Sequence, residues 1–260
     1  MIATQAHLTQ RIGALIERER RTRFAGGALG YLWAYVTPLM WIAFVVVLFR
    51  LLDRVPPLFV GAEIFVASGF LPYLIFRQTI TTLSRTVPAN RYMLYVRPVC
   101  VNDLLLASAL LEGFNVTVTA LLVFGAVTIA FRADLPADVA QVILGLCVAW
   151  LLGVGVGRFV AVVGLYSDSF ARAVPIILRP MFWLSGIFYT ATELPGVVQQ
   201  VLWFSPLLHI TETVREGYFL GYASPISDLW YPCLIAAGFF LISIPIEQAI
   251  TQHRLARRRL

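Results

Sequence analysis

Residues 139–165, VAQVILGLCVAWLLGVGVGRFVAVVGL, decide the fold class, because these 27 residues carry a single charge, Arg158. A helix of about 20 apolar residues crosses the hydrocarbon core of a bilayer. Small residues recur at every fourth position of this run: Gly145, Ala149, Gly153, Gly157 and Ala161. Residues four apart share one helix face, and small side chains let a second helix approach closely. We therefore expect a membrane span with a small-residue packing face.

Five further apolar runs cover residues 29–52, 58–80, 104–129, 173–188 and 229–250. Pro72 interrupts the second run, and Pro175 and Pro180 interrupt the short fifth, so kinks or partial unwinding are expected there. The chain is 59% hydrophobic and only 13% charged, with a mean hydropathy of +0.80. Soluble domains are about half apolar and about a quarter charged. The sequence predicts an all-α integral membrane protein with six transmembrane helices over residues 28–250.

The basic residues exclude an ATPase. All 20 are Arg, and the formal net charge is +6. A phosphate-binding P-loop needs a Lys, so a partner subunit would have to bind ATP and Mg. The three Cys lack ligand or disulfide spacing, and no nucleophile–base set, paired-carboxylate motif or metal motif is found. We predict no catalytic residue, metal or cofactor in this chain. The polar N-terminus and the long first apolar run also predict no cleavable signal peptide.

Residues 1–27 are predicted to form an amphipathic interface helix. Leu8, Ile12, Leu15 and Ile16 recur at helical spacing, and Arg11 and Arg18 fall on the other side. Three more basic residues follow: Arg20, Arg21 and Arg23. Such a helix lies on a membrane surface, and a solvated tail is the alternative.

Residues 189–228 are too apolar for an ordinary loop, yet each half is too short to span a bilayer. They predict two short helices that are either re-entrant, surrounded by protein, or flat on the surface. His209, Glu212 and Glu216 share a helix face, with Arg215 beside them. We interpret these four residues as an ion-pair network at an external gate, which is favoured over a metal site.

The distribution of Arg predicts the orientation. Six spans place both termini on one side, and thirteen Arg lie on that side against three on the other. Because basic residues concentrate on the cytoplasmic side, both termini are expected in the cytoplasm, together with segment 81–103 and the basic tail 251–260. Region 189–228 would then face outward. Segment 81–103 is either a docking element for a soluble partner or an ordinary connection. The polar residues that would serve in docking are Arg85, Asn90, Arg91 and Arg97.

Ionisable groups near spans usually face a bundle interior or a water-filled path. Arg158 and Arg179 could form a cationic wall that guides anionic groups. Alternatively they are structural, for instance paired with Glu112, or reach toward the interface. Aromatic rings could stack on sugars or belong to the interfacial belt. The candidates for sugar contact are Tyr31, Trp33 and Tyr73.

Several short stretches, in order along the chain, resemble KpsM-type permeases, the membrane subunits of type-two ABC exporters of capsular polysaccharide. They are RTRF at 21–24, LGYLWA at 29–34, AN at 89–90, RPV at 97–99, ALLE at 109–112, PI at 175–176, SPL at 205–207, RE at 215–216 and GY at 221–222. The resemblance extends from about residue 20 to residue 250.

The resemblance implies a homodimer that works with two copies of a cytoplasmic ABC ATPase. It implies export of a lipid-linked acidic polysaccharide across the bacterial inner membrane, with a periplasmic co-polymerase or export protein and an outer-membrane channel beyond. Segment 81–103 would couple to the ATPase, and the N-terminal helix, with Arg18, Arg20, Arg21 and Arg23, would lie where substrate comes in from the membrane lipid. Nothing points to nucleic acid.

Three alternatives remain open. An O-antigen or lipopolysaccharide export permease shares the same architecture. A secondary transporter would show repeat symmetry and a coupling carboxylate within a span. A membrane enzyme acting on lipid-linked sugars would show a clustered acidic or His motif, for which His209 and Glu212 are the one faint candidate.

Overall fold

The computed structural model describes residues 2–23, 28–58, 60–95 and 100–257. Within these ranges it describes no side chains at residues 2–9, 22–23, 28–32, 34, 94–95, 168–169, 171–172 and 250–257. The described elements are, in order, α1 (Ile2–Arg23), α2 (Ala28–Leu51), α3 (Ala62–Ala89), the 3-10 helix η1 (Arg91–Tyr95), α4 (Val101–Phe131), α5 (Val139–Gly164), α6 (Asp168–Leu184), the 3-10 helix η2 (Ala191–Glu193), α7 (Gly196–Leu202), α8 (Pro206–Tyr218) and α9 (Trp230–Arg257).

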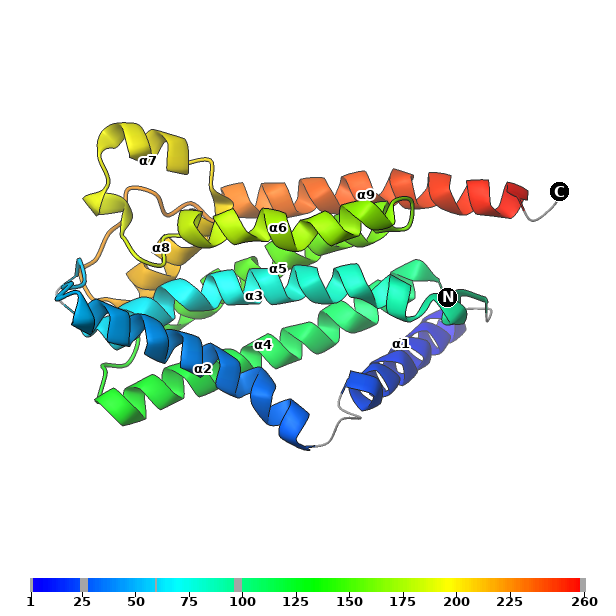
Figure 1. The fold of residues 1–260 in the computed structure, drawn as a ribbon. Helices are drawn as coiled ribbons and strands as arrows, with labels where there is room; N and C mark the ends of the chain where they lie inside the picture. The colour runs from blue at the N-terminus through cyan, green and yellow to red at the C-terminus, as the bar shows by residue number, and fades with distance from the viewer. Residues whose placement is uncertain (1, 24–27, 59, 96–99, 258–260) are drawn as a thin grey trace.

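Helices α2 to α6 and α9 run along the bundle (Figure 1). Helix α1 and both chain ends lie at one end, here named the termini end, while α7 and α8 lie at the opposite end, named the far end. This arrangement agrees with an even number of crossings. It places the described part of segment 81–103 beside α1 and region 189–228 at the other end of the bundle.

The prediction of an all-α membrane protein is confirmed. Four stretches are long and apolar enough to cross a bilayer: Ala62–Ala89, Val101–Phe131, Val139–Gly164 and Trp230–Ala249. Two shorter apolar stretches, Tyr35–Leu51 and Ala173–Leu184, belong to α2 and α6, so the count of six spans stays a prediction. Helices α3 and α6 are continuous through their internal Pro residues rather than partly unwound, as membrane helices tolerate when neighbours satisfy the freed backbone groups.

The small-residue face of α5 lets other helices approach closely, as expected. A Cβ added at Gly153 would lie 2.7 Å from Cβ of Thr79 on α3, and one at Gly157 would lie 3.1 Å from Cα of Ile80. At Gly145 the neighbour is α8, where the added Cβ would lie 2.6 Å from Cγ2 of Val214. Helices α3 and α5 therefore form the centre of the bundle.

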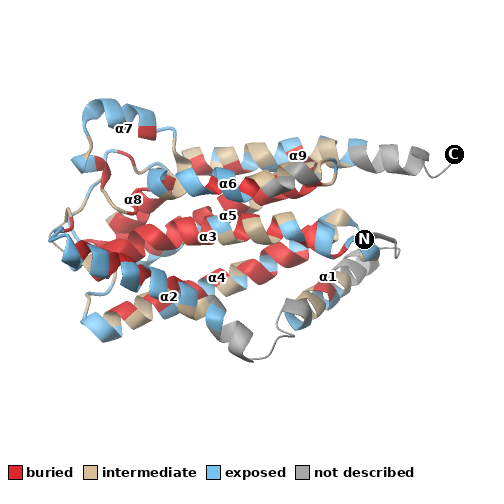
Figure 2. Ribbon diagram, in the orientation of Figure 1, coloured by how far each residue is buried: buried red, intermediate tan, exposed pale blue. Residues whose placement is uncertain are grey.

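Helix α8 lies inside the far end of the bundle, whereas α7 lies on its outside. Nearly all of α8 is buried against α3, α5, α6 and α9. Of α7, only Leu202 is buried, and Figure 2 shows the contrast between the two helices. The enclosed position of α8 matches the re-entrant alternative, because its backbone is surrounded by protein.

Helix α1 uses its apolar face to pack against the protein. Leu15 is buried against Leu104 and Ala107 of α4, and Ile12 and Ile16 adjoin the same cluster. Arg11 Nη1 also lies 3.8 Å from the Asp103 carboxylate at the start of α4. This face of α1 therefore packs at least in part against α4.

Candidate functional site

Two neighbouring clefts follow one face of α3 and share Gln78, Thr81 and Thr82. The first, named the basic cleft, has a volume of about 570 Å³ and lies between α2, α3 and α6. The second, named the polar cleft, has a volume of about 430 Å³, lies nearer the termini end, and is bounded by α1, α2, α3 and α4. Through the three shared residues the two clefts adjoin each other along α3.

The basic cleft joins two cations to a group of aromatic rings. Arg77 of α3 and Arg179 of α6 are exposed side chains that line it, and Tyr73 lines it one turn before Arg77. Tyr73 is itself buried and donates a hydrogen bond to the Leu178 carbonyl at 3.2 Å, which ties α3 to α6. Guanidinium groups bind carboxylates and phosphates well, so this cleft suits an anionic ligand.

Phe182 is the centre of the aromatic group. Its ring centroid lies 5.2 Å from that of Tyr73, 5.4 Å from Phe188, 5.6 Å from Trp183 and 6.4 Å from Trp41. These rings come from α2, α3, α6 and the segment after α6. Four of the five rings, Trp41, Tyr73, Phe182 and Trp183, line the basic cleft and give it an aromatic wall of the kind that sugar rings contact.

Arg158 occupies a different place from Arg179. It is only 5% exposed. Its Nη2 lies 2.6 Å from the Glu247 carboxylate, its Nε donates to Ser243 Oγ at 2.8 Å, and its Nη1 donates to Asn102. With these partners Arg158 joins α5 to α9 and α4. The geometry gives it the structural role that the sequence left open, with Glu247 rather than Glu112 as the partner.

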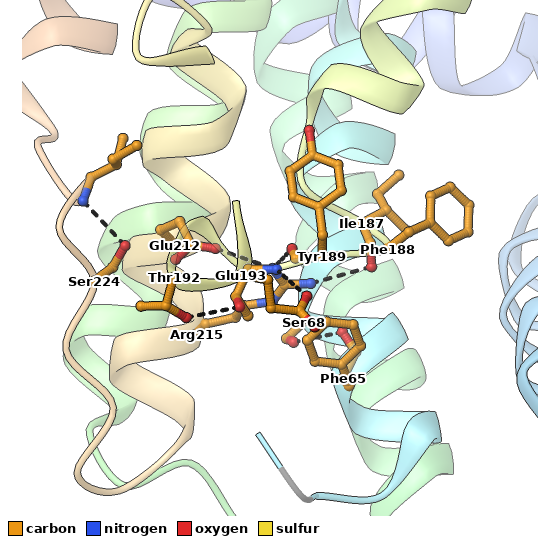
Figure 3. A network of polar contacts seen from close by, with 12 residues as sticks. Phe65, Ser68, Ile187, Phe188, Tyr189, Thr192, Glu193, Glu212, Arg215 and Ser224 are labelled. Carbon is orange, nitrogen blue, oxygen red and sulfur yellow. Dashed lines mark hydrogen bonds and ion pairs between the residues drawn. The ribbon is translucent and has the colours of Figure 1, made fainter. Parts of the chain in front are cut away.

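Arg215 is the centre of a buried network at the far end (Figure 3). It is 0% exposed, its Nη1 lies 3.2 Å from the Glu212 carboxylate, and its guanidinium lies 4.1 Å from the Phe65 ring centroid. It also donates to the Tyr189 carbonyl at 2.6 Å and the Ile187 carbonyl at 3.2 Å. Arg215 therefore holds the segment that follows α6, residues 187–189, against α8.

Two neighbours complete this network. Tyr222 donates a hydrogen bond to the second oxygen of Glu212, and burial followed by the adjacent carboxylate raises the pKa of Tyr222 above its ordinary value. Gly69 makes room for the guanidinium, because an added Cβ would lie 2.8 Å from Arg215 Nη2.

The other two predicted gate residues fix the segment between α8 and α9. Nε2 of His209 lies 2.8 Å from the Trp203 carbonyl, and its Nδ1 accepts from the Asp228 amide at 3.3 Å. This pattern fixes a neutral ring that donates from Nε2. Glu216 accepts from the Ser224 amide at 2.7 Å, from Ser227 Oγ at 2.8 Å and from Gln141 Nε2 at 3.1 Å. Among the described residues no group of His, Cys and acidic side chains is arranged to hold a metal.

The termini end brings α1 against the predicted coupling segment. Segment 81–103 begins as the last turns of α3, continues into η1, and ends in the first turn of α4. Arg18 Nη1 donates to Asn90 Oδ1 at 3.1 Å, and its guanidinium lies 5.1 Å from the Tyr92 ring centroid. Arg85 and Arg91 are exposed. This contact links the interface helix directly to the segment that precedes α4.

Arg20 and Arg21 bind the same acidic residue of α1. Their Nε atoms lie 2.9 and 2.8 Å from the Glu17 carboxylate. Hydrogen bonds, first from Arg20 and then from Arg21, lower the pKa of Glu17 to about 2. Both Arg remain exposed.

The structure thus brings Tyr73 and Arg179 together and leaves Trp33, which is 60% exposed, outside the cleft lining. The side chains of Arg23 and Tyr31, all of Arg97, and residues 258–260 of the tail lie outside the described residues. The residues that the sequence did not single out for the site are Arg54, Phe65, Gly69, Arg77 and Phe182. Of these, Arg77 had a signal, since it is a charge inside an apolar run.

Comparison with known proteins places this architecture. Residues 10–219 match the family described as ABC-2 type transporter. The chain is similar to the capsule polysaccharide export inner-membrane protein CtrC of Neisseria meningitidis serogroup A, at 27% identity over 235 residues, 90% of this chain and 89% of CtrC. It is similar to the polysialic acid transport protein KpsM of Escherichia coli, at 29% identity over 244 residues, 94% of this chain and 93% of KpsM. It is also similar to the capsule polysaccharide export inner-membrane protein BexB of Haemophilus influenzae, at 27% identity over 210 residues, 80% of this chain and 78% of BexB.

The family match covers residues 10–219, more than half of the chain, so the chain belongs to the ABC-2 type transporters.

Proposed function

We propose that this chain is the permease subunit of an ABC exporter that carries a lipid-linked acidic capsular polysaccharide across the bacterial inner membrane. The names of its relatives support the cargo and the membrane. The observation that carries the proposal is the basic cleft, where Arg77 and Arg179 face the same space as Tyr73 and Phe182. Cations match the acid groups of such a polymer, and aromatic faces match its sugar rings while allowing it to slide.

The permease works as a homodimer with two copies of a separate cytoplasmic ATPase, which binds ATP and Mg and hydrolyses the nucleotide. Segment 81–103 is the coupling element on the ATPase. One feature supports this role: α3 is a continuous helix from Arg77 in the basic cleft to Ala89, and η1 follows directly. Motion of the ATPase at η1 would therefore reach the cleft through a single rigid helix.

The far end faces the periplasm, and the termini end faces the cytoplasm. Helices α7 and α8 close the outer opening, where a periplasmic co-polymerase or export protein would take the polymer toward an outer-membrane channel. The buried position of α8 and the network around Arg215 support a gate that is held shut in the resting protein.

The test is to delete the gene, restore it on a plasmid, and locate the acidic glycan by cell fractionation. Polymer trapped in the cytoplasm of the deletion strain, and returned to the surface by the wild-type gene, is the expected result. Normal surface polymer without the gene would refute the proposal, and absence of any polymer would point to a biosynthetic enzyme. Loss of lipopolysaccharide O-antigen with intact capsule would identify the O-antigen alternative.

Two substitutions of Arg179, one that removes its charge and one that keeps it, test the basic cleft itself. Arg179→Gln is expected to lower export about tenfold, since hydrogen bonds to charged groups contribute roughly 1.5–3 kcal/mol. Arg179→Lys, which keeps the positive charge, is the matched control and should retain most of the export. Equal export by the Gln and Lys variants would contradict a cationic role for this residue.

A further inference from the structure

The polar cleft differs in chemistry from the basic cleft beside it. Its walls come mainly from the second half of α3 and the first half of α4, which contribute Thr82, Thr86, Glu112, Asn115 and Thr119. Glu112 is only 5% exposed. Glu19 and Arg85 also line this cleft. Because a carboxylate disfavours other anions nearby and the two carboxylates outnumber the one cation, the acid groups that suit the basic cleft do not suit this one.

The Thr hydroxyl groups of this cleft already donate hydrogen bonds to other atoms of the protein. Thr81 donates to the Arg77 carbonyl at 2.8 Å, Thr86 to the Thr82 carbonyl at 3.0 Å, and Thr119 to the Asn115 carbonyl at 2.9 Å. Thr82 donates to the Glu112 carboxylate at 3.1 Å. Because a hydroxyl has one proton and two lone pairs, these Thr side chains present acceptors to the cleft.

Asn115 adds a buried acceptor that the described protein leaves without a partner, its Oδ1 atom. Buried polar atoms nearly always have a hydrogen-bond partner, and a bound water or ligand group would supply one here. The cleft therefore offers several acceptors: the Glu112 carboxylate, the Asn115 amide oxygen and the Thr lone pairs. A ligand that donates several hydrogen bonds at once would match them.

We infer that the polar cleft is a subsite for the uncharged hydroxyl groups of the transported glycan. The inference rests on the proposed function and assigns a different part of the polymer to each cleft. Sugar hydroxyls donate to Glu112, Asn115 and Thr119 in the polar cleft, while acid groups meet Arg77 and Arg179 in the basic cleft. Because the clefts share Gln78, Thr81 and Thr82, adjacent sugar units can occupy both.

A matched pair on α4 isolates the role of the cleft. Thr119 lines the cleft, whereas Thr117 is exposed elsewhere on the helix, and each hydroxyl donates to the carbonyl four residues earlier, at 2.9 and 2.8 Å. Thr119→Val and Thr117→Val therefore each remove one hydrogen bond of the same kind, from the hydroxyl to the carbonyl four residues earlier. In the complete transporter, Thr119→Val is expected to lower export about threefold to tenfold at equal protein level, and Thr117→Val to leave it unchanged. Equal export by the two variants would overturn the inference.

Occupancy is tested directly by alkylation of Asn115→Cys. Cys147 and Cys233 are replaced by Ser, and the exposed Cys100 is kept as an internal reference. Labelling at position 115 with a maleimide, relative to Cys100, is expected to be at least about threefold slower in cells that make the polymer than in cells blocked in its synthesis. Labelling that is equally fast in the two strains overturns the inference. Labelling that is equally slow in both, relative to Cys100, also overturns it and would indicate a resident lipid headgroup. Failure of the wild-type gene to restore surface polymer would instead refute the proposed function, whatever these variants do.

Discussion

Arg215→Met tests the far-end network most sharply. The substitution keeps a long side chain but removes a guanidinium that is 0% exposed. It leaves the Glu212 carboxylate buried without its 3.2 Å ion pair, and the Ile187 and Tyr189 carbonyls without their donor. It also removes the cation that lies 4.1 Å from the Phe65 ring centroid.

The expected loss of stability follows from the complete burial of the pair. Removing one partner of a buried ion pair costs about 3–5 kcal/mol, because the other charge stays buried and uncompensated. In the double variant Arg215→Met/Glu212→Gln no charge is left uncompensated, but the Ile187 and Tyr189 carbonyls still lack their donor. The double variant should therefore recover about 2 kcal/mol relative to Arg215→Met.

The measurement is unfolding of the purified protein in mixed micelles with increasing SDS, followed by tryptophan fluorescence. Arg54→Met is the matched control, since Arg54 is exposed and donates to the neighbouring Phe188 carbonyl at 2.8 Å. Exposed polar contacts of this kind contribute at most about 1 kcal/mol. The reasoning is refuted if Arg215→Met costs no more than Arg54→Met, or if the double variant costs the sum of its two single changes.

Three further changes test the helix packing, the far-end tyrosine and the docking of α1. Gly153→Leu should lose about 1–3 kcal/mol of stability in the same assay, because its Cβ would lie 2.7 Å from Thr79 Cβ, whereas Gly125→Leu, which meets nothing within 4 Å, should cost little. Burial and the Glu212 carboxylate raise the pKa of Tyr222 above 10.0, so the folded protein holds this proton more tightly and loses stability as pH rises past 10. Tyr222→Phe should reduce that alkaline slope, and an unchanged slope would show that other groups cause it. Leu15→Asp should release α1 from Leu104 and Ala107, seen as faster amide exchange in α1, with exchange in α5 as the unaffected reference.

Much of the fold could be predicted from the sequence because the bilayer thickness sets how many consecutive apolar residues a membrane span needs. The apolar runs at 104–129 and 139–165 match α4 and α5 to within a few residues at each end. The repeat of small residues in α5 correctly indicated close helix packing. The six apolar runs predicted both termini at one end, and the structure places α1 and the C-terminal end of α9 there, while the cytoplasmic orientation predicted from the Arg distribution stays a prediction.

The site residues were harder to predict because their roles depend on which helix faces meet. Arg158 and Arg179 have the same charge and similar surroundings in the sequence. Only the packing of α5 against α9 gives Arg158 its partner Glu247, and only the open space between α2 and α6 leaves Arg179 exposed beside Tyr73. Nothing in the local sequence marked Phe182 as the centre of the aromatic group.

By itself, then, the sequence determined the membrane-protein class, the order of the helices, the absence of a P-loop lysine and the resemblance to a transporter family. These follow from composition, run length and motifs, which are properties of consecutive residues. The tertiary structure decided that α1 packs against α4, that α8 is enclosed at the far end, and that the face of α3 divides into a basic and a polar cleft. Those outcomes depend on contacts between residues far apart in the chain, because a buried charge or an amphipathic face takes whichever partner the packed helices bring to it.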